Sequence, residues 1–158
     1  MDNGLRFLEM IQKVFPVNSE VSFYFLKPIT LRSRKKLKAF LLKLVKQEAN
    51  AAATLSFVFC SDPYLLAMNR KFLGHDYFTD ILTFPLDPIP GVVHGEMYLS
   101  VDRIRDNAKQ LAAPTERELH RVIFHGVLHL CGYNDKTNIQ AKEIRAREDF
   151  YLKKYFRR

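Results

Sequence analysis

With 158 residues, the chain is long enough to bury a hydrophobic core, and 47% hydrophobic with 27% charged residues excludes a disordered or fibrous protein. Lysine and arginine number 25 against 17 aspartates and glutamates, and the resulting net charge of +8 favours an anionic partner, nucleic acid first and an anionic membrane surface second. No linker rich in proline, glycine or serine divides the chain, so we expect one domain over residues 1–158.

The cysteine content and the N-terminus indicate the compartment. Cys60 and Cys131 are too few for a disulfide framework, which favours a reducing environment. Residues 1–20 show neither the apolar core nor the cleavage site of a signal peptide, and no apolar run approaches membrane-spanning length. We expect a cytoplasmic protein without a membrane partner or a dinucleotide cofactor.

The first part of the chain predicts a strand, a helix and a second strand. Residues 21–26 are rich in β-branched and aromatic side chains and predict a strand. Apolar residues three and four apart predict an amphipathic helix over residues 31–48, and a mostly apolar run predicts a strand over residues 52–60. The polar face of the helix forms either a solvated surface or a phosphate-binding stripe. Its cations are Arg32, Arg34, Lys35, Lys36, Lys38, Lys43 and Lys46.

Proline and capping residues place the middle elements. Asp62 as N-cap, with Pro63 at the first helical position, predicts a short helix that reaches about residue 72. Strands follow over residues 81–86 and 92–100. Pro85 indicates a sheet edge or a strand end, because proline cannot donate to the hydrogen-bond ladder.

The last part of the chain predicts helices. One spans residues 101–111, and the next begins at a capping box formed by Thr115 and Glu118. A second capping box, Thr137 with Gln140, starts a final helix that reaches about residue 155. With strands early and helices late, the chain belongs to the α+β class.

Two histidines lie four residues apart inside the helix that follows residue 114. His125 and His129 are one helical turn apart, with Cβ atoms roughly 5–6 Å from each other, so one metal ion can bind both. Gly132 is suited to end the helix, because glycine enters the left-handed C′ conformation without a Cβ penalty. The turn can then bring Asp135 in as a third ligand, which leaves one coordination position open, as in catalytic sites. The alternative is a pair of inert, hydrogen-bonded histidines.

The spacing matches the metzincin protease pattern H-E-x-x-H-x-x-G-x-x-H, with Asp135 in the last place. Gly126 stands where the protease has its glutamate base, so peptide hydrolysis by that route is not expected. Asp135 has a surface or capping role as its alternative. As a ligand, a carboxylate would make the metal a weaker Lewis acid than a third neutral histidine would. Cys131 follows His129 by two residues, points away from the histidine face and is expected to be a buried thiol.

The run His125–Tyr133 (HGVLHLCGY) closely resembles the signature of the YbeY family of bacterial single-domain, metal-dependent endoribonucleases, which are linked to ribosomal RNA maturation and ribosome quality control. Met68-Asn69, Thr79–Pro85 (TDILTFP) and Gly95–Tyr98 (GEMY) are similar to further family blocks and stand in family order. The resemblance implies a central mixed four-stranded sheet flanked by helices, a zinc ion at the mouth of a basic cleft, and RNA as substrate.

Several positions depart from the family pattern. The family's third histidine ligand falls on Asp135, and the aspartate before it is Asn134. Leu73 stands where the family has an arginine thought to handle the scissile phosphate, so a bidentate phosphate clamp is missing. A neighbouring family lysine is His75, which could partly substitute as a cation or a general acid.

The resemblance also suggests roles for polar residues that would otherwise be turn or surface positions. His75 and Glu96 become candidate catalytic residues that assist water activation. The candidate substrate-binding residues are Arg70, Lys71, Thr79 and Asp80. Thr79 and Asp80 could also support the metal histidines.

We therefore expect one zinc ion per chain, bound by His125, His129 and Asp135, in an endoribonuclease that prefers single strands. Its expected substrate is ribosomal RNA, alone or in the small ribosomal subunit, and the nucleophile is water or the substrate's own 2′-OH. Two alternatives stay open. The missing arginine favours a catalytically weak ribosome- or RNA-associated factor with a structural metal, whereas a zinc peptidase is disfavoured by Gly126.

Overall fold

In the computed structural model, which describes residues 19–157, four strands form one sheet in the order β1–β2–β4–β3. The strands are β1 (Glu20–Phe25), β2 (Ala52–Cys60), β3 (Ile81–Pro85) and β4 (Val92–Ser100). β1, β2 and β4 run parallel, and β3 pairs antiparallel with β4 at the edge of the sheet. The expected α+β fold with a central mixed sheet is therefore confirmed, as is the edge position that Pro85 indicated.

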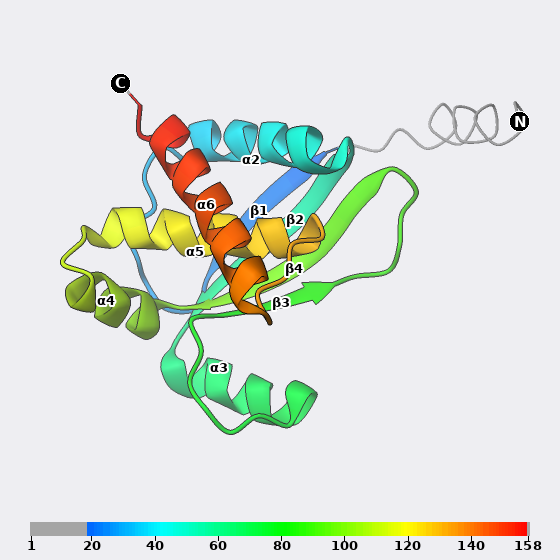
Figure 1. Cartoon of the computed structure of the whole chain (residues 1–158). Helices are drawn as coiled ribbons and strands as arrows, with labels where there is room; N and C mark the ends of the chain where they lie inside the picture. Colours follow the sequence, from blue (N-terminus) through cyan, green and yellow to red (C-terminus); the bar gives the residue numbers. More distant parts are fainter. Residues whose placement is uncertain (1–18, 158) are drawn as a thin grey trace, which may run out of the picture.

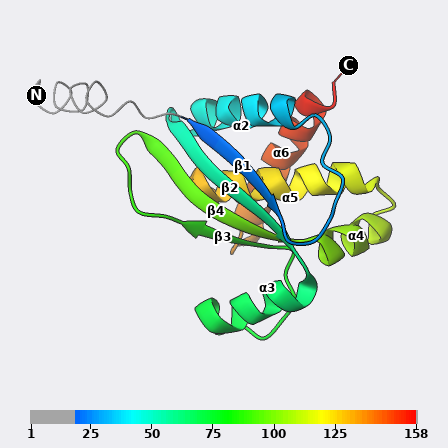
Figure 2. The same ribbon diagram turned by 180° about the vertical axis from the view of Figure 1, so that it is seen from behind.

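Helices cover the sheet unequally (Figure 1). They are α2 (Arg34–Ala49), α3 (Asp62–Met68), the π-helical turn η1 (Asn69–Leu73), α4 (Val101–Gln110), α5 (Thr115–Leu130) and α6 (Asn138–Tyr155). α2 and α5 pack on one face with α6 across α5, whereas the view from behind looks onto the other face, with α3 below it (Figure 2). Within the described residues, no helix is both long enough and apolar enough to cross a bilayer.

α5 lies unusually close to the sheet because two glycines face the interface. A Cβ on Gly126 would lie 2.6 Å from Cδ1 of Ile81 and 3.0 Å from Sδ of Met97. A Cβ on Gly95 would lie 2.4 Å from Cδ1 of Leu130. This close packing brings the histidine face of α5 next to β3. Of the expected apolar stripe, Leu119, Val122, Ile123 and Val127 are buried, and Leu130 is partly buried.

Some predicted helix starts are wrong by one residue or more. Ser61, not Asp62, caps α3, since its hydroxyl accepts a hydrogen bond from the Tyr64 N–H at 3.3 Å. Pro114 occupies the N-cap position of α5, so Thr115 is already helical and forms no capping box. α2 begins at residue 34 rather than 31.

The second predicted capping box is confirmed at the start of α6. The Thr137 hydroxyl accepts from the Gln140 N–H at 3.2 Å, and the Gln140 side chain accepts from the Thr137 N–H at 3.2 Å.

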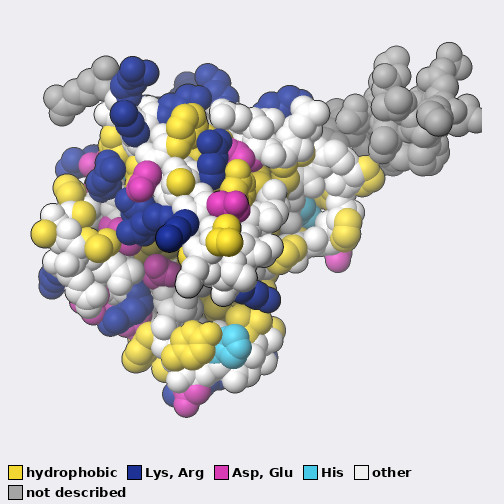
Figure 3. Space-filling view, viewed as in Figure 1, with side chains coloured by type: hydrophobic (Ala, Val, Ile, Leu, Met, Phe, Trp, Pro, Cys, Tyr) yellow, Lys and Arg dark blue, Asp and Glu magenta, His cyan; other side chains and the backbone are white. Residues whose placement is uncertain are grey.

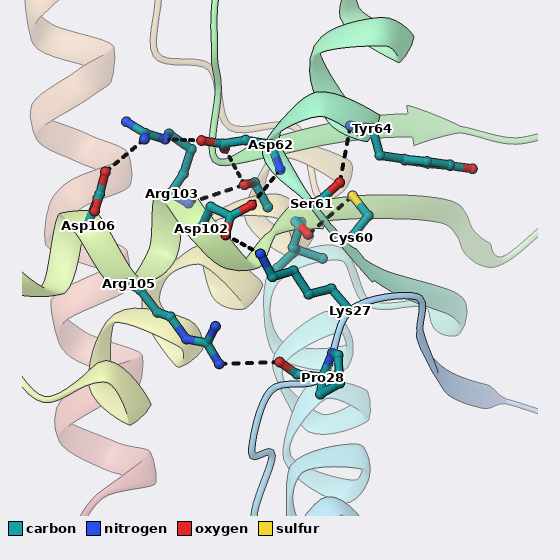
Figure 4. Close-up of polar contacts among 12 residues, drawn as sticks. Lys27, Pro28, Cys60, Ser61, Asp62, Tyr64, Asp102, Arg103, Arg105 and Asp106 are labelled. Carbon is teal, nitrogen blue, oxygen red and sulfur yellow. Dashed lines mark hydrogen bonds and ion pairs between the residues drawn. The ribbon is translucent and has the colours of Figure 1, made fainter.

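A polar network joins the strand ends to α3 and α4 (Figure 4). Asp62 accepts a hydrogen bond from Nε of Arg103 at 2.8 Å, and Asp102 accepts from the Asp62 N–H at 2.8 Å. Lys27, after β1, forms an ion pair with Asp102 and is the main reason why the pKa of that carboxyl lies below its usual value. Every carboxylate of this network is paired, so it stabilises the fold.

Candidate metal centre

Three side chains from α5 and the following turn converge on one point. The Nε2 atoms of His125 and His129 lie 2.9 Å apart, and Oδ2 of Asp135 lies 3.6 Å from the first and 3.4 Å from the second. Each residue offers one ligand atom within 4.8 Å of the other two. A tetrahedral ion with bonds of roughly 2.0–2.1 Å requires ligand atoms roughly 3.3–3.4 Å apart. The spacing of the three donors therefore fits one such ion.

The end of α5 explains how Asp135 reaches the histidines. The Gly132 N–H donates to the His129 carbonyl at 3.0 Å, and the Tyr133 N–H donates to the Leu128 carbonyl at 3.1 Å, which together form a Schellman motif. Gly132 has a φ of +105°, a conformation that residues with a Cβ rarely adopt. The expected helix-ending role of Gly132 is confirmed, and it turns the chain back toward α5.

The Nδ1 atoms of both imidazoles already have partners. Nδ1 of His129 lies 2.8 Å from the carbonyl oxygen of Tyr133, and because a carbonyl only accepts, this Nδ1 carries the proton. Nδ1 of His125 lies 3.7 Å from a carboxylate oxygen of Glu148, which favours the same tautomer. Both Nε2 atoms then point toward one position, where a cation could bind the lone pair of each. The residues fit a metal ion, since imidazole nitrogens and a carboxylate oxygen are common ligands of divalent transition metals.

Carboxylates around the pair favour positive charge. Burial by itself would lower the pKa of His125, but Glu148, Asp80 and Asp135 outweigh it, and the pKa is raised. Burial raises the pKa of Asp80, which accepts a hydrogen bond from Nδ2 of Asn107 at 3.3 Å. The electrostatic environment thus attracts a cation.

Two hollows meet at this cluster and share Asp80, His125 and Asp135. The outer hollow has a volume of about 610 Å³ and follows β3. Its other residues include Leu73, Thr79, Thr83, His129 and Lys136. The inner hollow, of about 360 Å³, lies between α5 and α6 and includes Glu118, Arg121, Arg145 and Glu148. The candidate metal centre is therefore open to a ligand from the side of β3.

The structure brings some of the predicted site residues to this centre and leaves others apart. Thr79 and Asp80 line the outer hollow together with the histidines. Leu73, which stands where the family has its arginine, also lines the outer hollow, so an apolar side chain replaces the guanidinium there. His75 is not among the residues that line either hollow, and its Nδ1 lies 3.0 Å from the Tyr77 hydroxyl.

Glu96 lies on the opposite face of the sheet. Side chains alternate along a strand, and its neighbours Gly95 and Met97 face α5. Glu96 instead accepts a hydrogen bond from the Tyr98 hydroxyl at 2.9 Å. The expected catalytic role of Glu96 is therefore incompatible with its place in the fold.

Arg70 and Lys71 lie on η1, and neither lines a hollow at the metal ligands. Arg70 forms an ion pair with Asp76. Lys71 places Nζ 5.2 Å from the ring centroid of Phe72. The two cations therefore belong to the surface beside the outer hollow, and the expected direct contact with a substrate at the metal ligands does not follow from their positions.

Sequence reasoning missed supporting residues that are distant along the chain. Glu148 on α6 supports His125, and the Tyr133 carbonyl holds His129. The Tyr133 hydroxyl donates to Glu48 of α2 at 2.8 Å, and Glu48 also accepts from Nε of Arg147 at 3.0 Å. Burial opposes the charge of Glu48, but its hydrogen bonds outweigh burial and lower its pKa. No local sequence pattern marks these contacts between helices.

Comparison with known proteins agrees with this fold. The sequence profile described as "Endoribonuclease YbeY" matches residues 26–156. The Endoribonuclease YbeY of Cytophaga hutchinsonii is 44% identical over 136 residues, which cover 84% of this chain and 95% of that protein. That of Flavobacterium psychrophilum is 35% identical over 133 residues, 84% of this chain and 94% of that protein.

A solution structure of a Thermotoga maritima protein is similar with a TM-score of 0.60 and 26% sequence identity, over 87% of this chain and 89% of that one. With a profile match over most of its length and relatives of this similarity, the chain belongs to the endoribonuclease YbeY family.

Proposed function

We propose that the protein is a zinc-dependent endoribonuclease that prefers single-stranded RNA and acts in ribosomal RNA maturation and ribosome quality control. The observation that carries the proposal is the convergence of His125, His129 and Asp135 at the edge of an open hollow, in a member of an endoribonuclease family. The net charge of +8 supports an RNA partner, either ribosomal RNA or the small ribosomal subunit. The proposal includes one domain over residues 1–158, a cytoplasmic location and one ion per chain.

Zinc bound to these three residues would supply a Lewis acid for the negative charge that develops on a phosphodiester. The chain's own residues hold the geometry. The Tyr133 carbonyl and the Glu148 carboxylate fix the two imidazoles from behind, so that both Nε2 atoms point at one position. Lys136 lines the outer hollow and is placed to attract a phosphate. The nucleophile is either water or the 2′-OH next to the scissile phosphate.

A catalytically weak RNA-associated factor with a structural metal is the second candidate, and a specific observation favours it. Among the described residues, Lys136 is the sole lysine or arginine that lines the outer hollow. Leu73, about half exposed, occupies the position of the family arginine, so no bidentate guanidinium reaches a phosphate there.

A zinc peptidase is the less favoured alternative. Gly126 faces Ile81 and Met97 in the interface between α5 and the sheet, where a glutamate base could not point toward a substrate.

Two measurements test the proposal. Metal analysis of the purified protein should find about one zinc ion per chain, and His129→Ala should lose most of it. A full metal complement in His129→Ala would contradict the ligand assignment.

Incubation of zinc-loaded protein with ribosomal RNA should give discrete cleavage products that a chelator abolishes. RNA binding that survives His125→Ala, without any cleavage by the zinc-loaded wild type, would instead establish the RNA-associated factor. Chelator-sensitive degradation of an unstructured protein would establish the peptidase.

A further inference from the structure

Large apolar side chains are exposed at the end of η1 and on the chain that leads from it to β3. Phe72, Tyr77 and Phe78 are 57%, 56% and 53% exposed, and Leu73 is 48% exposed. Four of the twelve large hydrophobic residues that the described chain exposes thus fall within seven consecutive positions. Figure 3 shows hydrophobic side chains gathered on the lower part of the molecule, over α3 and the chain that follows it. We call residues 72–78 the aromatic segment.

Internal contacts hold the aromatic segment in place. Asn69, which is buried, donates from Nδ2 to the Tyr77 carbonyl at 3.0 Å. Gly74 turns the chain with a φ of +65°, and Phe72 packs edge-on against Phe84 of β3 with ring centroids 6.0 Å apart. The exposed rings are therefore held on an ordered support, at low entropic cost for a ligand that stacks on them.

Cations lie beside these rings. Nζ of Lys71 is 5.2 Å from the centroid of Phe72, and the guanidinium of Arg103 is 5.4 Å from that of Phe78. Exposed aromatic faces interleaved with positive charge are the combination by which proteins bind single-stranded nucleic acid, because bases stack on the rings and cations neutralise the phosphates. Arg103 also pairs with Asp62 and Asp106, so Lys71 beside Phe72 is the cation available to a phosphate.

The aromatic segment also borders the candidate metal centre. Leu73, inside it, and Thr79, directly after it, line the outer hollow with His125 and His129. Phe72 packs on Phe84, which faces away from α5, so a strand with one phosphate at the candidate metal ligands would pass around the β3 edge of the sheet to reach this ring.

We propose that the aromatic segment is a base-stacking subsite for unpaired RNA, with Phe72 and Tyr77 as its stacking residues. The inference rests on the proposed function, since it names how the substrate of that site is bound. In a duplex, neighbouring bases already cover one another's faces, so the rings gain contacts with unpaired nucleotides alone. The subsite thereby supplies a physical reason for single-strand preference.

The experiment measures binding in the presence of chelator, so that neither metal nor cleavage is required. The chain contains no tryptophan, and Phe72→Trp therefore introduces a unique fluorophore. Titration with a single-stranded oligoribonucleotide should quench its emission, whereas the matching duplex should not. Phe72→Ala and Tyr77→Ala should each weaken single-strand binding about tenfold to a hundredfold, with duplex binding unchanged.

Phe150→Ala is the matched control, because Phe150 on α6 is also exposed and also flanked by cations, with the Arg147 guanidinium 4.6 Å from its ring centroid. It should bind RNA like the wild type. Phe72→Leu keeps an apolar side chain but removes the ring, and should weaken binding as strongly as Phe72→Ala.

Wild-type affinity in Phe72→Leu would show that apolar surface rather than stacking matters, and would overturn the subsite. Absence of single-strand binding by the wild type, or equal losses in Phe150→Ala and Phe72→Ala, would also overturn it. A protein that binds as described but never cleaves RNA contradicts the proposed endoribonuclease while it leaves the subsite intact.

Discussion

Glu148 supports a candidate metal ligand from behind, at the imidazole nitrogen that points away from the other two donors. One of its oxygens lies 3.7 Å from Nδ1 of His125, and its side chain is only 5% exposed between α5 and α6. Removal of such a supporting partner typically costs about tenfold to a hundredfold in metal affinity. We expect Glu148→Gln to weaken zinc binding by that factor, as measured by competition with a chromophoric chelator.

Glu118→Gln provides the control for this substitution. Glu118 is as buried as Glu148 and lies at a similar distance from Arg121, 3.8 Å against 3.9 Å, but within the described residues its ion pair is with Arg121 and not with either candidate ligand histidine. Its substitution should leave the zinc affinity unchanged. Equal affinities in the two variants would show that Glu148 does not support His125.

At the residue scale, the sequence could predict what helix periodicity and turn chemistry determine. The i, i+4 spacing of His125 and His129 and the glycine that ends α5 were sufficient to bring both histidines and Asp135 together. Glu148 could not be found this way, because its contact joins two helices. Glu96 was assigned wrongly because the sequence does not reveal which alternate side chains of β4 face α5.

The turn after α5 is the element that builds the site, and Gly132 is its critical residue. Its φ is +105°, and a Cβ added there would have no atom within 4 Å, so alanine would meet backbone strain but no steric overlap. We expect Gly132→Ala to lower the free energy of unfolding by about 1–2 kcal/mol. Because the same turn positions Asp135, zinc affinity should fall as well. Urea denaturation and metal competition measure the two effects.

Gly74→Ala is the control that distinguishes a loss of stability caused by backbone strain from a loss of zinc affinity caused by a displaced Asp135. Gly74 also has a positive φ, +65°, and equally open surroundings, but it lies at the end of η1 and not in the turn that carries Asp135. A similar loss of stability with normal zinc affinity is the expected result. If Gly132→Ala also binds zinc normally, the turn does not hold the third ligand.

The ends of strands and helices were predicted well where a single sequence feature determined them, and less well where two neighbouring residues could each cap a helix. β2 and β4 match their predicted ranges: β2 is a mostly apolar run, and β4 begins directly after the turn that Pro90 and Gly91 form. At the start of α3, Ser61 and Asp62 are both good caps, and the structure uses the first. Before α5, Pro114 takes the cap position and displaces the predicted box. Neighbouring residues of similar chemistry therefore limit the accuracy of helix ends.

The positive charge of the whole molecule is distributed over several surfaces, and α2 carries much of it. Several cations there have partners within the chain. Lys36 donates to the Tyr155 carbonyl at 2.9 Å, and the guanidinium of Arg34 lies 4.5 Å from the Phe25 ring centroid. α2 also lies at the opposite end of the molecule from α3 and β3 (Figures 1 and 2). The arrangement favours a solvated, partly structural face over a phosphate-binding stripe.

Salt dependence can determine which cations contact RNA. For single strands, the logarithm of the binding constant falls with the logarithm of salt concentration, with a slope of about −0.7 for each phosphate neutralised. Lys136 lines the outer hollow, so Lys136→Gln should reduce the magnitude of this slope by about 0.7. Lys43 is exposed on α2, and Lys43→Gln should leave the slope unchanged. Anisotropy titrations between low and physiological salt measure both. If only Lys43→Gln reduced the slope, RNA would contact α2 and not the outer hollow beside the candidate metal centre.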